Sequence, residues 1–174
     1  MAVVSPDLFV LVLRVLLGLL LAGHGAQKVF GAFEGPGLEG FRARVANIGF
    51  PARPFAELAA FGELVGGLAL AVGLLTPIAC AVLAVDMLVA ILKVHGPKGL
   101  WVTKGGYEYP LTLLVIFALI GLTGPGRYAI DAALALMPSP PIFVLVFIAG
   151  TAIVLAASRR RAAAAEQGRG KTVA

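Results

Sequence analysis

The sequence predicts an all-α protein that crosses a lipid bilayer several times. Of its 174 residues, 60% are hydrophobic and only 13% are charged. Several apolar runs approach or exceed about twenty residues, the length that lets a helix cross the roughly 30 Å hydrocarbon layer. Most basic residues lie between these runs or at their ends. This combination excludes an ordinary water-soluble domain.

Five apolar segments are the expected membrane spans, at residues 8–30, 55–75, 77–95, 107–123 and 141–157. We expect the first four to form an antiparallel four-helix bundle within a domain of residues 1–135. The second and third are joined so tightly, at Thr76 and Pro77, that they should form a helical hairpin. Residues 136–158 then hold a fifth transmembrane helix, and residues 159–174 form a basic tail expected to be mobile.

A short amphipathic helix is predicted between the first two spans, in the stretch GPGLEGFRARVANIGFP. Leu38, Phe41, Val45 and Ile48 recur there at helical spacing. Such a helix lies on or dips into the membrane surface. It is either an ordinary connector or a flap that covers a ligand.

The basic residues predict the orientation of the chain in the membrane. With five spans, Arg127 is the only loop cation on one side, and the other side receives Lys28, Arg42, Arg44, Arg53, Lys93, Lys98, Lys104, Arg159, Arg160, Arg161, Arg169 and Lys171. The positive-inside rule then places the amino terminus outside and the carboxyl tail in the cytoplasm. Because residues 1–7 hold no basic residue, we expect the first span to be retained rather than cleaved as a signal. The net charge of +5 is explained by topology, so we expect no nucleic-acid partner.

Three charged residues lie deep within the predicted spans, well away from the span ends: Arg14, Glu63 and Asp86. Ionised groups at this depth are costly unless they face the bundle interior and find partners. Small residues share a helical face with these charges, namely Gly18, Ala22 and Gly25 with Arg14, and Ala56, Ala59, Ala60, Gly66 and Gly67 with Glu63. The first two spans should therefore pack closely. Depth favours Asp86 as the partner of Arg14, but Glu63 or both acids remain open, as does a purely structural role.

A second polar group is predicted at the cytoplasmic end of the spans. It consists of His24, Gln27, Lys28, Lys93, His95, Tyr107 and Glu108. The candidate catalytic residues are Glu63, His24, Glu108 and His95, and the candidate ligand-binding residues are Arg14, Lys28, Gln27 and Tyr107. Together they offer hydrogen-bond donors and groups that titrate near neutrality, which could bind and protonate a quinone-like carbonyl. Each residue taken singly also fits a structural role at a membrane interface.

No intrinsic cofactor is evident from the sequence. A haem held by His24 and His95 is a much weaker alternative, and no cluster has the spacing of metal ligands. The single cysteine, Cys80, excludes an internal disulfide and is expected to be a small buried residue. In the turn GPGRYAID we expect a local structural pair between Arg127 and Asp131.

The chain resembles the DoxX family of small bacterial membrane proteins. The resemblance rests on RVLLGLLLAGHGAQKVFG, GFP, ELVGGLALAVGLLTP, MLVAILKVH, GGYEYPLTLL and GPGRYAID, in that order over about residues 8–131. It implies a four-helix membrane core in a bacterial inner membrane and a link, by analogy, to thiosulfate:quinone oxidoreductase subunits. The family pattern draws attention to Arg14, His24, Lys28, Glu63, His95 and Glu108, while Asp86 is added from its depth alone.

The resulting hypothesis is a subunit of a quinone-linked oxidoreductase, or a quinone-binding membrane component. With one cysteine and no flavin or nucleotide motif, the chain would need a separate redox partner protein. Two alternatives stay open: a non-catalytic subunit that anchors a redox or stress-response complex, and a pathway for a small solute or protons. The sequence does not predict the oligomeric state.

Overall fold

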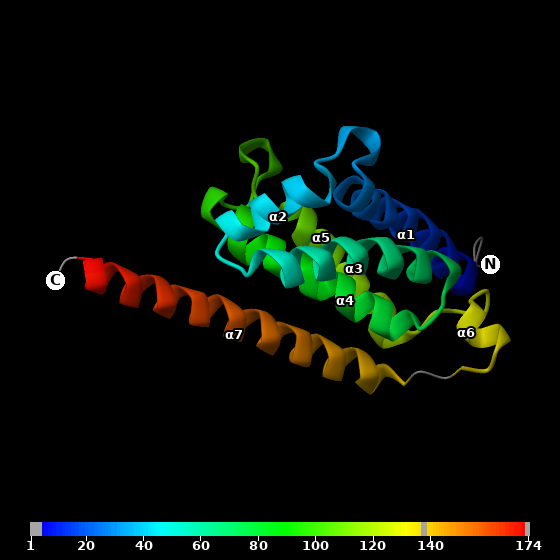
Figure 1. The fold of residues 1–174 in the computed structure, drawn as a ribbon. Helices are drawn as coiled ribbons and strands as arrows, with labels where there is room; N and C mark the ends of the chain where they lie inside the picture. The colour runs from blue at the N-terminus through cyan, green and yellow to red at the C-terminus, as the bar shows by residue number, and fades with distance from the viewer. Residues whose placement is uncertain (1–4, 137–138, 173–174) are drawn as a thin grey trace.

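The computed structural model describes residues 5–136 and 139–172 and consists of helices joined by short connections (Figure 1). The α-helices are α1 (Pro6–Phe30), α2 (Gly37–Asn47), α3 (Ala52–Val72), α4 (Thr76–Val89), α5 (Glu108–Thr123), α6 (Ile130–Ala133) and α7 (Pro140–Thr172). Short helical segments complete the chain: η1 (Ala32–Glu34), the π-helical η2 (Ala90–His95), η3 (Gly96–Lys98) and η4 (Val102–Lys104).

Among the described residues, four helices are long and apolar enough to cross a membrane: Pro6–Phe30, Ala52–Val72, Thr76–Lys98 and Pro140–Arg160. The predicted fold class, an all-α protein with several membrane helices, is confirmed. The remaining predicted span is α5, a shorter apolar helix of 16 residues. At 1.5 Å per residue it rises about 24 Å, less than the thickness of the hydrocarbon layer.

Helices α1 and α3 pack backbone against backbone, as the small-residue faces predict. A Cβ atom built on Gly67 would lie 2.5 Å from the amide nitrogen of Ala22 and 2.6 Å from the carbonyl oxygen of Gly18. A Cβ on Gly18 would likewise lie 2.5 Å from the amide nitrogen of Ala71. Only glycine permits this approach, so these residues fix the distance between the two helices.

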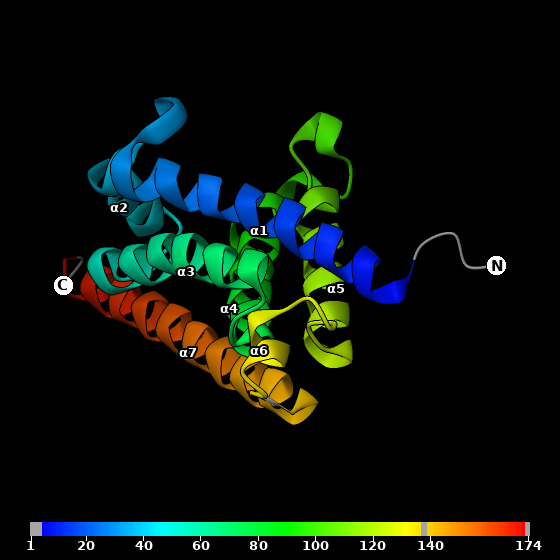
Figure 2. The same cartoon turned by 90° about the vertical axis from the view of Figure 1, so that its right-hand side faces the viewer.

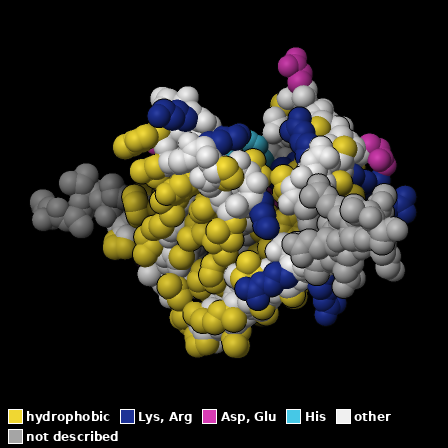
Figure 3. Space-filling view, turned by 90° about the vertical axis from the view of Figure 1, so that its left-hand side faces the viewer, with side chains coloured by type: hydrophobic (Ala, Val, Ile, Leu, Met, Phe, Trp, Pro, Cys, Tyr) yellow, Lys and Arg dark blue, Asp and Glu magenta, His cyan; other side chains and the backbone are white. Residues whose placement is uncertain are grey.

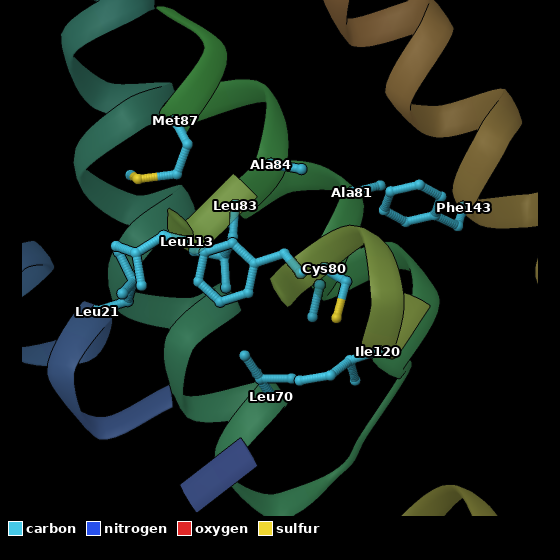
Figure 4. Close-up of a cluster of buried hydrophobic side chains, with 12 residues drawn as sticks. Leu21, Leu70, Cys80, Ala81, Leu83, Ala84, Met87, Leu113, Ile120 and Phe143 are labelled. Carbon is cyan, nitrogen blue, oxygen red and sulfur yellow. The ribbon is translucent and has the colours of Figure 1, made fainter. Parts of the chain in front are cut away.

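Helix α4 is the central element of the rest of the bundle, because it packs against α3, α5 and α7 (Figures 1 and 2). The main apolar cluster joins Leu21 of α1, Leu70 of α3, Leu83 of α4, Leu113 of α5 and Phe143 of α7 (Figure 4). Cys80 is fully buried in the same cluster, as expected. The five long helices therefore share one core.

Helix α2 is the predicted amphipathic helix between the first two spans. Its Val45 is buried with Phe50 and Ala56 in a second apolar cluster. On its polar side, Arg42 pairs with Glu39 of the same helix and with Glu57 of α3. The hydrogen bond to Glu57 is the largest of the effects that raise the pKa of Arg42 above its usual value. These contacts tie α2 to α3.

Arg14 faces the protein interior, as predicted, but its partners differ from the predicted ones. Its Nη1 atom donates to the carbonyl oxygens of Leu70 and Ala71 at 3.3 Å, and its Nη2 donates to that of Tyr128 at 3.2 Å. The predicted pairing with Asp86 or Glu63 is therefore wrong. Carbonyls in the last turn of a helix lack intrahelical donors and carry the negative end of the helix dipole, so they can hold a buried cation.

Asp131 is also fully buried. It binds the backbone on the α4 side of the α3–α4 turn, whereas Arg14 binds the α3 side. Its carboxylate accepts from the backbone N–H groups of Leu75 and Thr76, at 2.7 and 2.8 Å, where α4 begins. It also attracts Arg14 electrostatically. The predicted local pair of Asp131 with Arg127 is wrong, because the Arg127 guanidinium lies over the Tyr128 ring, 5.0 Å from its centroid.

The carboxyl-terminal tail is helical over most of its length, which the sequence analysis did not predict. Helix α7 starts where the fifth span was expected but continues to Thr172, through most of the tail expected to be mobile. The alanine run at residues 162–165 explains this, because alanine is the strongest helix former. The helix is 33 residues long, about 50 Å, and so extends past any single bilayer crossing that it makes.

We predict that Arg14→Met lowers the free energy of unfolding by about 3 kcal/mol, because it leaves buried Asp131 and three carbonyls without their cation. Thermal unfolding in detergent measures this loss. Arg127→Met is the matched control, since Arg127 is exposed and should contribute less than about 1 kcal/mol. Equal melting temperatures for the two variants would contradict the capping role of Arg14.

We also predict opposite effects for two neighbouring glycines of α1. A Cβ on Gly25 would collide with the backbone of Leu64, whereas a Cβ on Gly23 meets nothing within 4 Å. Gly25→Ala should therefore lower the melting temperature. Gly23→Ala should leave it unchanged or raise it, by up to about 1 kcal/mol in stability, because alanine favours the helix. The reverse order would show that α1 and α3 do not approach this closely.

Candidate functional site

The candidate site centres on an ion pair between α1 and α3. The Nζ atom of Lys28 lies 2.5 Å from Oε2 of Glu63. Glu63 is only 3% exposed, although it sits in the middle of a membrane helix. The close approach of Gly25 to Leu64 brings these two helices together within one turn of both charged residues. The packing of small residues thus positions the pair.

Asp86 of α4 brings a second carboxyl group to this pair. Its carboxyl group interacts electrostatically with that of Glu63. We refer to Lys28, Glu63 and Asp86 as the Lys28 cluster. It joins three helices, and it holds one ammonium group and two carboxyl groups. The sequence analysis placed both acids in a buried cluster but assigned them the wrong cation.

Two aromatic residues border the Lys28 cluster, and the sequence analysis missed both roles. The Nζ atom of Lys28 lies 4.7 Å from the centre of the Phe41 ring, a cation–π contact from α2. Tyr109 of α5 interacts electrostatically with Glu63. Phe41 was identified only by its place on the apolar face of α2, and Tyr109 directly follows the candidate Glu108. Helix α2 therefore touches the site, which keeps the interpretation of a covering flap open.

In both histidines, the ring nitrogen Nδ1 forms a hydrogen bond with an oxygen atom. Nδ1 of His24 lies 3.1 Å from the side-chain oxygen of Gln27, and Nδ1 of His95 lies 2.7 Å from the backbone oxygen of Gly105. Because an oxygen of this kind only accepts, Nδ1 carries the hydrogen in each ring. When the ring is neutral, its Nε2 then has a free lone pair. Each histidine is suited to accept a proton or a hydrogen bond.

The remaining candidates lie on the segments around the ends of η2 and α5. The ammonium of Lys93 lies over the Phe50 ring, 5.6 Å from its centroid. The backbone N–H groups of Tyr107 and Glu108 donate to Gly99 and Leu100, which closes the connection between η3 and α5. Among the described residues, Lys28 contacts Glu63, and Asp86 interacts electrostatically with Glu63. No described contact joins Tyr107, Glu108 or Lys93 directly to these three residues.

Arg14 does not belong to this site. It precedes Lys28 by 14 residues on the same helix, which is a rise of about 21 Å. The predicted charge cluster of Arg14, Glu63 and Asp86 is thus split between two ends of the bundle. Arg14 stabilises the α3–α4 turn, and Lys28 takes its place beside the acids.

The molecular surface is hollowed near the end at which Lys28 lies. Figure 3 shows a recess between two projecting lobes, with a histidine side chain inside it and Lys or Arg side chains around it. The connections at residues 31–36 and 96–106 project on the same side in both ribbon views (Figures 1 and 2). A ligand with hydrogen-bond acceptors would meet several donors here. Among the described residues, no group of three or more His, Cys, Asp or Glu could hold a metal ion.

Comparisons with known proteins agree with the architecture. The DoxX family model matches residues 9–96, which hold most of α1, all of α2 to α4, the Lys28 cluster and His95. The chain is also similar to an uncharacterized membrane protein of Mycobacterium tuberculosis, with 31% identity over 138 residues, or 72% of this chain and 81% of that protein. No solved structure matches. The extent of the family match, together with the membrane bundle, shows that the chain belongs to the DoxX family.

Proposed function

We propose that the protein is a quinone-binding component of the membrane and acts as a subunit of a quinone-linked oxidoreductase. The observation that carries the proposal is the ion pair between partly exposed Lys28 and buried Glu63 at the recessed, basic end of the bundle. A quinone offers two carbonyl oxygens on a planar ring. Lys28 has three N–H donors, and its pair with Glu63 leaves others for a ligand oxygen.

The aromatic and imidazole groups around Lys28 suit the two redox forms of such a ligand. A quinone carbonyl accepts a hydrogen bond from Lys28, and its ring can pack beside Phe41. A quinol carries O–H groups, which can donate to the free Nε2 atoms of His24 or His95. In this scheme His95 or Glu108 relays protons toward the basic end, while Arg14 has no part in it.

The electrons must reach a bound quinone from a separate redox partner. Cys80, the single cysteine, is fully buried in the apolar core and is unsuited to thiol chemistry. We further propose that the protein lies in a bacterial inner membrane with its basic end in the cytoplasm. The distribution of Lys and Arg residues supports this orientation through the positive-inside rule.

A non-catalytic anchoring subunit is the second candidate function. Its support is helix α7, in which only 6% of the apolar window in Pro140–Arg160 is buried. Lipid can cover such a face, but so can a helix of a partner protein. In that case the Lys28 cluster would serve to fix the helices in register.

Bound quinone distinguishes the two functions. We predict that organic extraction of the purified protein releases a quinone, and that a short-chain quinone raises its melting temperature with the logarithm of its concentration above the dissociation constant. The charge-compensated variant Lys28→Met/Glu63→Gln should fold but bind the quinone at least about tenfold more weakly, because a hydrogen bond from a charged donor is lost.

Lys104→Met is the control, since it removes an exposed lysine of η4. It should keep the quinone-dependent shift of the wild type. An extract free of quinone and no shift in the wild type would overturn the proposed function and favour the anchoring role. An equal shift in the double variant would show that the ligand binds away from the Lys28 cluster.

A further inference from the structure

The connection between η2 and α5, residues 96–107, carries three consecutive exposed apolar side chains. Leu100, Trp101 and Val102 have exposed fractions of 37%, 63% and 54%. None of them belongs to either of the two apolar clusters in the part of the chain that the structure describes. We refer to residues 96–107 as the Trp101 loop. An apolar run on a projecting loop needs another surface to cover it.

Hydrogen bonds hold the backbone of the Trp101 loop in a closed form. The N–H group of Gly106 donates to the carbonyl oxygen of Trp101 at 3.0 Å, and that of Glu108 donates to Leu100 at 2.9 Å. A Cβ atom built on Gly106 would lie 2.3 Å from the carbonyl oxygen of Gly99, so glycine is required at this crossing. The loop is therefore a defined structure that is bonded to the first residue of α5.

The length of α5 places this loop at the surface of the bilayer. With 16 residues, α5 rises about 24 Å, which is less than the roughly 30 Å of the hydrocarbon layer. A membrane span of this length keeps its ends at the level of the headgroups or below it. The preceding candidate span, Thr76–Lys98, ends two residues before Leu100. Both ends of the loop thus lie at the membrane interface rather than in bulk water.

Two lysines, Lys98 and Lys104, flank the apolar run. Both are exposed, and neither forms an ion pair with any residue that the structure describes. The sequence of residues 96–107 contains no acidic residue. A tryptophan between apolar neighbours suits the boundary between acyl chains and headgroups, and the flanking ammonium groups suit the phosphates of anionic lipids.

A second connection at the same end of the bundle also exposes aromatic side chains. Phe30 ends α1 and Phe33 follows it in η1, and their exposed fractions are 72% and 77%. This connection and the Trp101 loop project on the same side of the molecule (Figures 1 and 2). Two separate segments therefore present aromatic groups where a lipid surface would cover them.

We propose that the Trp101 loop binds anionic phospholipid in the leaflet at the basic end of the bundle. Leu100, Trp101 and Val102 insert among the upper parts of the acyl chains, and Lys98 and Lys104 bind the lipid phosphate. This interaction is separate from the Lys28 cluster and does not rest on the proposed quinone function.

The fluorescence of Trp101 tests the insertion, because it is the only tryptophan in the chain. The full-length protein is reconstituted in vesicles in which part of the phospholipid carries bromine atoms, which quench tryptophan on contact. Bromines near the headgroup should quench Trp101 more than bromines near the end of the acyl chain. Acrylamide, a quencher dissolved in the water, should have little effect.

Lipid selectivity tests the role of the two lysines. Brominated phosphatidylglycerol should bind beside Trp101 at least about fivefold more strongly than brominated phosphatidylcholine. Lys98→Gln/Lys104→Gln should lose this preference but keep the depth of Trp101, whereas the charge-conserving Lys98→Arg/Lys104→Arg should keep both. Arg44→Gln/Arg53→Gln is the matched control, because it removes two exposed cations from α2 and α3, and it should also keep both.

Strong quenching by acrylamide without quenching by brominated lipid would show that the loop stands in water, and the proposal would be wrong. Equal binding of the two brominated lipids by the wild type would also contradict it, as would a preference that persists in Lys98→Gln/Lys104→Gln. Quinone binding enters none of these measurements. The lipid site and the proposed function can therefore fail independently.

Discussion

The close contact between α1 and α3 is the constraint on which the rest of the structure depends. Gly18 and Gly67 let the two backbones touch, and no larger residue would fit there. The contact runs along most of both helices, with a basic residue near each end. At one end Arg14 reaches the last carbonyls of α3, and at the other Lys28 reaches Glu63. The same interface therefore supports both an architectural site and a candidate functional site.

The charged groups at the two ends of the α1–α3 contact are compensated in different ways. At the α3–α4 turn, the guanidinium of Arg14 caps the end of one helix while Asp131 caps the start of the next. Cation and anion match in number there, and both are fully buried. At the opposite end one ammonium faces two carboxyl groups, and Lys28 is partly exposed. A balanced, closed site fits a structural role, whereas an unbalanced, accessible site fits the handling of a ligand or a proton.

The sequence was sufficient to predict the helices, because each membrane span is an apolar run of defined length. It also predicted the α1–α3 interface, since Gly18, Ala22 and Gly25 share one face. The partners of the charges were harder to predict. Arg14 binds backbone carbonyls, which every residue has and no sequence pattern reveals. Asp131 caps a helix that begins 55 residues earlier, so its role depends on the tertiary fold.

The predicted depths of the side chains also led to an error at the candidate functional site, where the wrong cation was assigned to Glu63 and Asp86. Glu63 and Asp86 were predicted to belong to one buried cluster, but depth was used to choose Asp86 as the nearer partner of Arg14. Lys28 was assigned to a separate polar group because it lies at the end of its span, about six residues, or less than two turns, from the predicted depth of Glu63. A long lysine side chain can bridge that difference. Its ammonium is therefore found in the protein interior, against both Glu63 and the ring of Phe41.

Solid-state NMR of the protein in lipid bilayers tests the central claim most directly. The measurement is the dipolar coupling between the Nζ nitrogen of Lys28 and the side-chain carboxyl carbon of Glu63, with the two residue types isotopically labelled. A strong coupling, corresponding to an ammonium in direct contact with the carboxylate, is the predicted result. No detectable coupling in folded protein would show that α1 and α3 do not bring these charges together, and would contradict the account of the site.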